Sequence, residues 1–475
     1  MRITDVIRMA VDAMGIACFF GLILLAIWGL GYGLVYKKIL GGTRKIKVKN
    51  IGLMAIFFCY IVVGLSATML NRKGETSSGL ELTLFASYRQ AWNGFSDSLW
   101  RNILLNIAMF IPLGFILPLL SEKCKTFWVT YLAGFGFTLF IELTQLLTGK
   151  GICEADDMLN NTCGALIGFG LYTIFAAFVQ WRKKEKINKK QVILAQIPLV
   201  VAVLSFCGIF LFYHNKELGN LSFSYTSRVN MAKVQVKLDI ELEERSEEAP
   251  VYKLYEASRS ETLDLAEALF AKTGTTVDLA ATDVYDDTII YHSQDGNCVL
   301  WVDYLGFRVD YTNYADTWDM DEFSEKAVLE NATREQVEKA LAFMDIQVPA
   351  CTSFEEIDPG TYQFAANKKV EGDVLYHGNL RVELNEESEI ISMEDNLVAY
   401  QFYKSYDLRS EREAYDDFLA GKFQAGWKQE FSEVIVKDVK LQYWTDTKGY
   451  FQPVYGFTVA LDGEWGTVYI PAIES

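Results

Sequence analysis

Six apolar runs of helix length dominate the first 213 residues, and they constrain the fold more than any other feature of the chain. Most of them are near the length at which a helix crosses about 30 Å of hydrocarbon. We therefore expect this part to form an α-helical polytopic membrane bundle with six spans. The predicted spans cover residues 15–36, 51–70, 103–120, 127–147, 158–181 and 192–213.

Charge separates this apolar part from the rest of the chain. Residues 1–216 contain 22 Lys or Arg and 11 Asp or Glu, whereas residues 217–475 contain 22 Lys or Arg and 50 Asp or Glu. The apolar, basic part suits an integral membrane domain, and the polarity of the acidic part suits a soluble one. Because the acidic part would be repelled by phosphate groups, we do not expect nucleic acid as a partner.

The acidic part has the patterns of a mixed α+β fold. Residues 234–242 alternate between apolar and polar side chains, as in a half-buried strand. Residues 333–336 and 410–413 have the capping-box pattern of helix starts. We expect a six-span membrane domain over residues 1–213 and an acidic, extracytoplasmic α+β domain over residues 214–475, whose two halves could meet near residue 350.

The loops between the apolar runs indicate the orientation of the bundle. Lys and Arg are enriched in three loops, at residues 37–49, 123–125 and 182–190. A six-span bundle places these loops on one side, which the positive-inside rule assigns to the cytoplasm. The N-terminus and everything after residue 213 would then be extracytoplasmic. Arg2 and Arg8 disagree mildly with this topology.

Polar side chains interrupt the apolar runs, and under this topology they all fall in the outer half of the membrane. A carboxylate or amide in hydrocarbon costs several kcal/mol unless it is paired or faces water. Glu142 and Gln145, three residues apart, share one helix face. We therefore predict an outward-facing acidic pocket for ligand binding. Its candidate residues are Asn106, Glu142, Gln145, Lys150, Asp156, Asp157 and Asn161.

Alternative roles for these residues stay open at this point. The amides could form interhelical hydrogen bonds, and Asp156 and Asp157 could be solvated acids that the dipole of a helix start favours. The acids Glu142, Asp156 and Asp157 are also candidates for acid/base catalysis. Four further residues have a predicted structural role in kinking or close packing of helices, namely Pro112, Gly114, Gly164 and Gly168.

Metal and cofactor sites are not expected. No CxxC motif occurs, and the three histidines are scattered along the sequence, so the usual pattern of a zinc site is missing. Cys298 and Cys351 are the two cysteines of the acidic part. They could form a disulfide, although nothing in their spacing demands one.

The polar residues and their spacing resemble the VanZ-like family over residues 51–181. The matching motifs are Asn106…Phe110-x-Pro112-x-Gly114, Glu142-x-x-Gln145, Gly149-Lys150-Gly151-x-x-Glu154-x-Asp156-Asp157 and Asn161-Thr-x-Gly164. Lys150 stands where the family usually has arginine, which keeps the charge but loses the bidentate fork. In the acidic part, residues 413–423 and 450–455 are similar to YycH/YycI-type regulators of a sensor kinase.

The VanZ-like resemblance implies a cell-envelope protein of a Gram-positive-type plasma membrane, with a link to teicoplanin resistance and no established reaction. We expect the acidic pocket to bind an envelope lipid, a lipid-linked cell-wall precursor or a glycopeptide. A membrane-embedded acid/base enzyme that acts on a lipid-linked substrate is one alternative. The other is a sensor or regulator that contacts a membrane-protein partner through the acidic domain.

Overall fold

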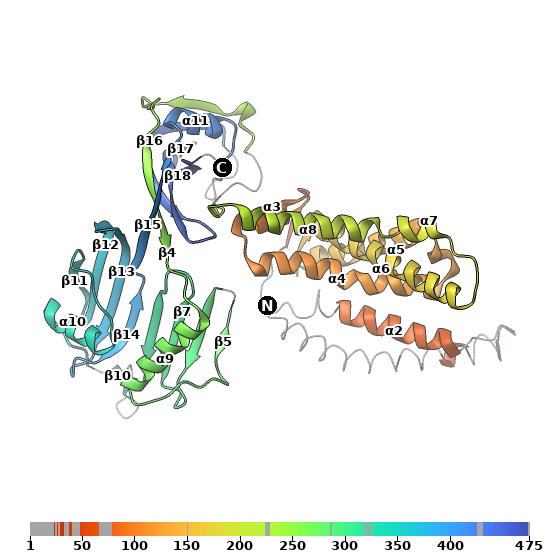
Figure 1. The fold of residues 1–475 in the computed structure, drawn as a ribbon, viewed down its shortest axis with the longest axis horizontal. Coiled ribbons are helices and arrows are strands. Elements are labelled where there is room, and N and C mark those ends of the chain that lie inside the picture. Colours follow the sequence, from red (N-terminus) through yellow and green to blue (C-terminus); the bar gives the residue numbers. More distant parts are fainter. Residues whose placement is uncertain are drawn as a thin grey trace. The chain divides into compact units, whose positions relative to one another are not determined.

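The computed structural model describes residues 23, 26, 29–32, 38–39, 48–65, 78–149, 151–223, 229–285, 287–316, 318–319, 324–325, 327–424 and 431–473. The chain forms two compact units, Met1–Glu217 and Leu218–Ser475. The first is helical and the second is built around a large sheet (Figure 1).

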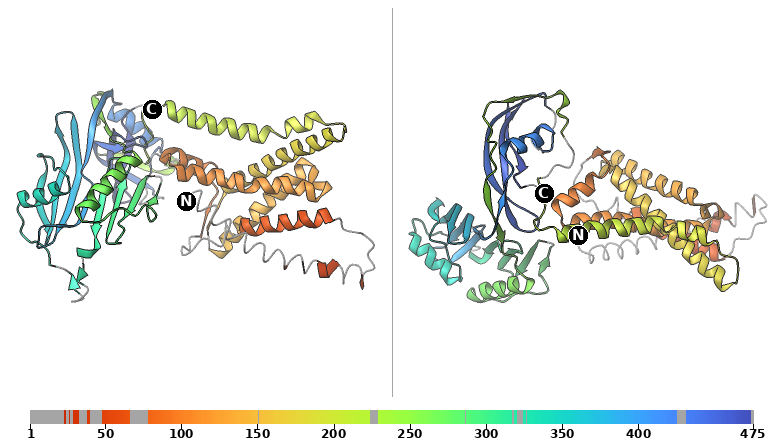
Figure 2. Two further views of the ribbon diagram at one scale, coloured as in Figure 1. Left: turned by 60° about the horizontal axis from the view of Figure 1, so that its bottom comes forward. Right: turned by 45° about the horizontal axis from the view of Figure 1, so that its top comes forward.

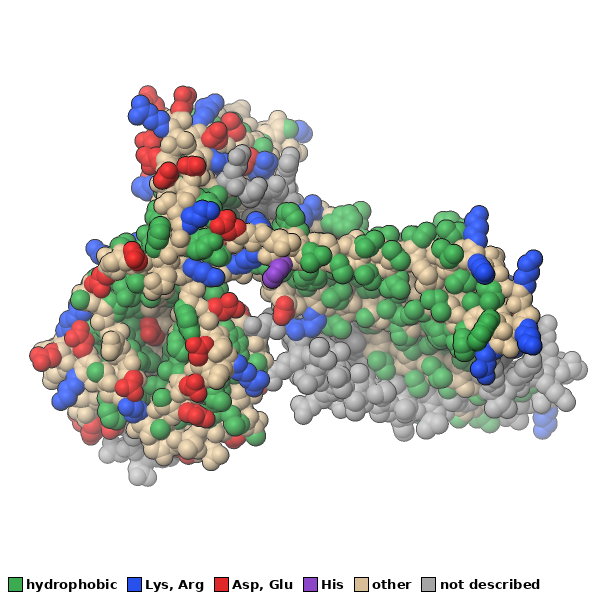
Figure 3. Space-filling model, viewed as in Figure 1, with side chains coloured by type: hydrophobic (Ala, Val, Ile, Leu, Met, Phe, Trp, Pro, Cys, Tyr) green, Lys and Arg blue, Asp and Glu red, His purple; other side chains and the backbone are tan. Residues whose placement is uncertain are grey.

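The first unit is a group of long apolar helices, which Figure 2 shows from two sides. The helices are α2 (Val48–Leu65), α3 (Ala86–Gly94), α4 (Asp97–Leu120), α5 (Phe127–Thr148), α6 (Ala155–Arg182), α7 (Lys189–Leu194) and α8 (Ile197–Asn215), with a 3-10 turn at Glu122–Lys125. Two short strands, β1 (Ser78–Glu81) and β2 (Gly151–Glu154), pair in parallel. Exposed apolar side chains cover the sides of this unit, as a membrane-embedded surface requires (Figure 3).

Four helical segments within the described residues are long and apolar enough to cross a membrane: α4, α5, α6 and the α7–α8 segment Lys189–Asn215. This finding supports a helical membrane region but not the predicted number of six spans. The predicted run at 15–36 lies largely outside the described residues. The described apolar helix Ile51–Leu65 is shorter than the other four.

Two predicted spans also differ from the observed helices. The helix predicted from residue 103 begins at Asp97, because Ser96 caps it by accepting a hydrogen bond from the Leu99 backbone N–H. The run at 192–213 is broken into α7 and α8 at Ala195, shortly before a proline in the first turn of α8. Proline is well tolerated in a first helical turn, but Pro198 has no backbone N–H to donate to the carbonyl four residues earlier, at Leu194, where α7 ends. This accounts for the break.

Glycines bring the backbones of α4 and α6 into contact. A Cβ atom at Gly164 would lie 2.0 Å from the carbonyl oxygen of Ile107, and a Cβ at Gly168 would lie 2.0 Å from that of Ile111. From the other side, a Cβ at Gly114 would lie 1.8 Å from the carbonyl oxygen of Ala165. No residue other than glycine fits these positions without separating the helices. Pro112 lies inside α4, which continues to Leu120.

The second unit is an α+β fold. Its described strands form one 14-stranded sheet, in which most neighbours are antiparallel and β3 pairs in parallel with β16. The strands are β3 (Gln235–Leu238), β4 (Glu248–Leu254), β5 (Asp283–Val284), β6 (Thr288–His292), β7 (Cys298–Asp303), β8 (Val309–Asn313), β11 (Ser353–Asp358), β12 (Thr361–Glu371), β13 (Val374–Leu384), β14 (Ile390–Asp395), β15 (Val398–Asp407), β16 (Glu433–Thr445), β17 (Tyr450–Leu461) and β18 (Glu464–Pro471). A separate short pair joins β9 (Trp318–Asp319) and β10 (Ser324–Glu325).

Two main hydrophobic cores support this sheet. In the larger one, α9 (Arg259–Lys272) and α10 (Arg334–Phe343) pack on β6–β8 and β12–β14. It includes residues from both sides of position 350, among them Met344 and Phe364. In the smaller one, α11 (Glu411–Leu419) packs on β16–β18, as Figure 1 shows. Both capping boxes predicted from the sequence are present, at the starts of α10 and α11.

The two cysteines of this unit are not joined. Cys298 is buried in the larger core, where its sulfur lies 3.5 Å from the Tyr311 hydroxyl. Cys298 and Cys351 are both free thiols.

A half-buried carboxyl at the end of β14 makes the stability of this unit depend on pH. Burial raises the pKa of Asp395 to about 6, although its side chain accepts a hydrogen bond of 3.0 Å from the Leu397 backbone N–H. A raised pKa means that the folded state prefers the neutral carboxyl. Stability is therefore fully present below the unfolded pKa of about 4 and is lost as the pH rises through about 6.

We expect Asp395→Asn to stabilise the second unit at pH 8 by up to about 3 kcal/mol and to change little at pH 4, because asparagine is neutral and keeps an acceptor for Leu397. Hydrogen exchange of the β14 amides in the full-length protein measures this, with variant and wild type compared at the same pH. Asp407→Asn, at an exposed position on β15, is the matched control. Equal protection of Asp395→Asn and wild type at pH 8 would contradict the prediction.

Candidate functional site

The candidate site lies where α5 ends and α6 begins. Strand β1 pairs with β2 along four residues, from Ser78 opposite Gly151 to Glu81 opposite Glu154. Helix α3 follows β1 along the chain. Together, β1 and α3 form a cover over this end of the helices. Aromatic side chains fix that cover: Phe95, which follows α3, stacks on Tyr213 of α8, and Trp92 of α3 contacts Phe212.

Asp156, in the first turn of α6, holds this cover in place. Its carboxylate accepts hydrogen bonds from the Phe85 backbone N–H (2.6 Å), the Ser87 backbone N–H (2.9 Å) and the Ser87 hydroxyl (2.6 Å). The side chain is only 2% exposed. Its negative charge therefore lies at the N-terminal ends of both α3 and α6, where the helix dipoles favour it. Since three donors engage both oxygens, Asp156 positions its neighbours.

Asp157 connects α6 to α4. The Asn106 side-chain amide donates a hydrogen bond of 2.5 Å to its carboxylate. Both side chains are half-buried. The carboxylate and amide predicted from separate apolar runs thus lie next to each other.

Glu142 connects α5 to β2. Its side chain is 2% exposed and accepts a hydrogen bond of 3.1 Å from the Glu154 backbone N–H. Gln145 lies on the same helix face, is also buried, and its backbone carbonyl accepts the N–H of Gly149, which ends α5 in the left-handed conformation. The left-handed turn at Gly149 directs the chain from α5 into β2.

Asn161 faces α5 from α6. Its side-chain NH₂ donates a hydrogen bond of 2.8 Å to the Thr138 hydroxyl, and both residues are buried. The Asn161 side-chain oxygen is buried and has no hydrogen-bond partner among the described residues. A buried acceptor without a partner costs about 1–3 kcal/mol, so this oxygen is a group that a ligand could satisfy.

Asn160, which is not among the site residues predicted from the sequence, adds a second unsatisfied group. Its side-chain oxygen accepts a hydrogen bond of 2.5 Å from the Tyr88 hydroxyl of α3, while its NH₂ group is buried without a partner in the described part of the chain. A signal for Asn160 was present: it lies four residues after Asp156 on the same helix face. The position of Tyr88 beside Asn160 depends on the fold of the cover.

The acids gather around one buried thiol in β2. Burial raises the pKa of Cys153, and the neighbouring carboxylates of Glu142, Asp157 and Glu154 raise it further. The structure therefore brings together six of the seven predicted ligand-binding residues at one end of the helices. The seventh, Lys150, lies outside the described residues. In the part of the chain that is described, no three His, Cys, Asp or Glu side chains are arranged to hold a metal ion.

Comparison with known proteins identifies this region. Residues 51–176 match the family model for VanZ/LLP1, so all of the predicted site residues lie inside the match and the VanZ-like resemblance is confirmed. No curated protein matches the chain. Among solved structures, the Bacillus megaterium YpeB C-terminal domain is similar over 46% of this chain and 94% of that chain, at 11% identity. Its TM-score of 0.19 is too low to support a conclusion about the fold.

Proposed function

We propose that the VanZ/LLP1 region at residues 51–176 equips a plasma-membrane protein of a Gram-positive-type bacterium with an outward-facing acidic binding site. The ligand is an envelope lipid, a lipid-linked cell-wall precursor or a glycopeptide, and its binding lowers susceptibility to glycopeptides such as teicoplanin. In this proposal the bundle has six spans, and its N-terminus and the acidic second unit are extracytoplasmic. The positive-inside rule supports that orientation.

The observation that carries this proposal is the pair of unsatisfied amide groups beside the acids. Within the residues that the structure describes, the Asn161 oxygen and the Asn160 NH₂ group are both buried without a partner. Unsatisfied buried groups are rare in folded proteins, and each one calls for an explanation. A bound ligand that accepts from Asn160 and donates to Asn161 would remove both costs.

The composition of the site favours a particular kind of ligand. Glu142 and Asp157 are carboxylates, which accept hydrogen bonds and attract positive charge. A ligand with amine, amide or hydroxyl groups matches them, and such groups are present in peptide-bearing and sugar-bearing envelope molecules. Asp156 is held by three donors already, so it supports the proposal as a positioning residue.

Glu142→Gln is expected to remove most of the protection against teicoplanin. Glutamine keeps the shape of the side chain, but it removes the charge, and a hydrogen bond to a charged group is worth about 1.5–3 kcal/mol. We therefore expect binding about tenfold or more weaker. The measurement is the teicoplanin concentration that inhibits a susceptible host expressing wild type or variant, with membrane abundance checked by immunoblot.

The matched control is Glu122→Gln, which removes an equally charged group from an exposed position at the other end of α5, where it pairs with Lys125. This variant should protect as well as wild type does. If Glu142→Gln also protects fully at equal abundance, the acidic site does not carry the function. Loss of protection on deletion of residues 218–475, with an intact bundle, would then favour a regulatory role of the second unit.

A further inference from the structure

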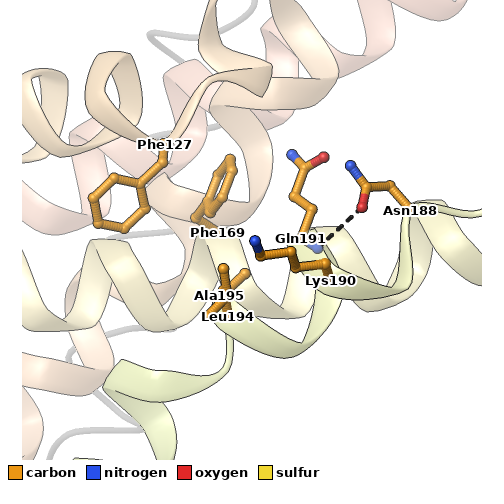
Figure 4. A pocket seen from close by; sticks show the side chains of 7 residues that line it. All are labelled: Phe127, Phe169, Asn188, Lys190, Gln191, Leu194 and Ala195. Atoms are coloured by element: carbon orange, nitrogen blue, oxygen red, sulfur yellow. Dashed lines mark hydrogen bonds between the residues drawn. The ribbon is translucent and has the colours of Figure 1, made fainter.

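A pocket of about 470 Å³ lies at the other end of the helical unit from the acidic site. Figure 4 shows that aromatic rings from α5 and α6 form one side and that side chains from α7 and its ends form the other. The two rings meet edge to face with their centroids 6.0 Å apart. The lining residues are Phe127, Phe169, Asn188, Lys190, Gln191, Leu194 and Ala195.

The walls of this pocket are held by hydrogen bonds, so it is present before anything binds. The Gln196 side-chain NH₂ donates to the Gly170 carbonyl (3.0 Å) and to the Thr173 hydroxyl (3.2 Å) of α6. Gly170 permits this approach, because a Cβ there would lie 2.5 Å from the carbonyl oxygen of Ala195. The Asn188 side chain accepts from the Gln191 backbone N–H and caps α7.

The rim of the pocket is strongly basic. Figure 3 shows Lys and Arg side chains gathered at this end of the helical unit. From the last residue of α6 to the second residue of α7, the chain carries one acid, Glu185, among six basic residues. None of the six forms an ion pair with a described carboxylate. They are Arg182, Lys183, Lys184, Lys186, Lys189 and Lys190.

We propose that this pocket binds an anionic phospholipid. Its apolar wall suits an acyl chain, and the ammonium of Lys190 at its rim suits the phosphate of the head group. The pocket lies at the ends of membrane-length helices, where lipid head groups meet the protein. Basic pockets between such helices are a known setting for anionic head groups, and each Lys near an anionic membrane surface contributes about 1 kcal/mol.

The acyl chain and the head group both contribute in this proposal. Leu194 and the rings of Phe127 and Phe169 would bury methylene groups, each of which stabilises the complex by the transfer of apolar surface out of water. Water-soluble phosphate compounds lack that contribution and should bind poorly. A zwitterionic phospholipid lacks the net charge that the basic rim attracts. The proposal does not depend on the function of the acidic site.

The test is native mass spectrometry of the purified full-length protein in detergent with added phosphatidylglycerol or phosphatidylcholine. We expect phosphatidylglycerol to bind more tightly than phosphatidylcholine, and glycerol phosphate not to displace it. Lys190→Gln should weaken phosphatidylglycerol binding about fivefold, the loss expected for one basic group at an anionic surface. Unchanged phosphatidylcholine binding would show that the variant remains folded.

Lys186→Gln is the matched control, since it removes the same charge from the same exposed segment without lining the pocket. It should weaken binding clearly less than Lys190→Gln does. Equal losses of phosphatidylglycerol affinity in the two variants would assign that affinity to the basic segment as a whole. That result would overturn the proposal that the pocket binds the lipid. Equal affinity of wild type for the two lipids, or full displacement by glycerol phosphate, would overturn it as well.

Discussion

Gly164→Ala is expected to destabilise the helical unit by about 2–3 kcal/mol, although alanine is the better helix former. The added Cβ would lie 2.0 Å from the Ile107 carbonyl oxygen, far inside van der Waals contact. Backbone atoms cannot rotate away as a flexible side chain can. The helices α4 and α6 must therefore separate. This separation also breaks the neighbouring contact between Gly168 and Ile111.

Gly136→Ala provides a control with the same chemical change. Gly136 lies in α5, and no described atom lies within 4 Å of the position that its Cβ would take. That variant should be neutral or stabilised by up to about 1 kcal/mol, the gain in helix propensity. Thermal unfolding of the full-length variants in detergent, followed by loss of the monodisperse peak, measures both. If the two variants unfold at the same temperature, the close contact of α4 and α6 does not stabilise the protein.

The glycine pair illustrates what a local pattern can and cannot predict. The spacing of Gly164 and Gly168 indicates close helix packing, but it does not name the partner helix. The partner is α4, because Gly114 offers a third position without a side chain at the matching height. Length and hydropathy alone predict spans, and neither quantity reports a break within an apolar run. The break at Ala195 depends on a proline in the first turn of α8 and on contacts with α6.

The candidate site was predictable in its acids and amides but not in their partners. Glu142, Asp157 and Asn161 stand out because polar groups are costly in apolar runs. The donors to Asp156 come from a segment about 70 residues earlier in the chain, and no local rule links the two. The same limit applies to the second unit. The alternation of apolar and polar side chains indicates the strand β3, but it does not indicate that β3 pairs in parallel with β16, almost 200 residues later in the chain.

Asp156→Asn is expected to release the cover formed by β1 and α3. Asparagine keeps one acceptor oxygen, but its NH₂ group would face N–H or O–H donors at Phe85 or Ser87. The variant loses charge-assisted hydrogen bonds and leaves a buried donor unsatisfied, together a cost of about 3 kcal/mol or more. Because a helix of nine residues is not stable alone, α3 should open locally while the long helices stay packed.

Trypsin detects this opening at Arg89, in the middle of α3, because cleavage there requires the helix to unfold. We expect cleavage of the full-length Asp156→Asn variant at Arg89 to be at least about tenfold faster than that of wild type, as a loss of 1.4 kcal/mol in the opening equilibrium already gives a factor of ten. Asp97→Asn, at an exposed acid in the first turn of α4, should leave the rate unchanged. Equal rates for all three proteins would show that Asp156 does not hold the cover. Its burial would then point to a direct part in ligand binding, which the teicoplanin assay of the same variant would detect.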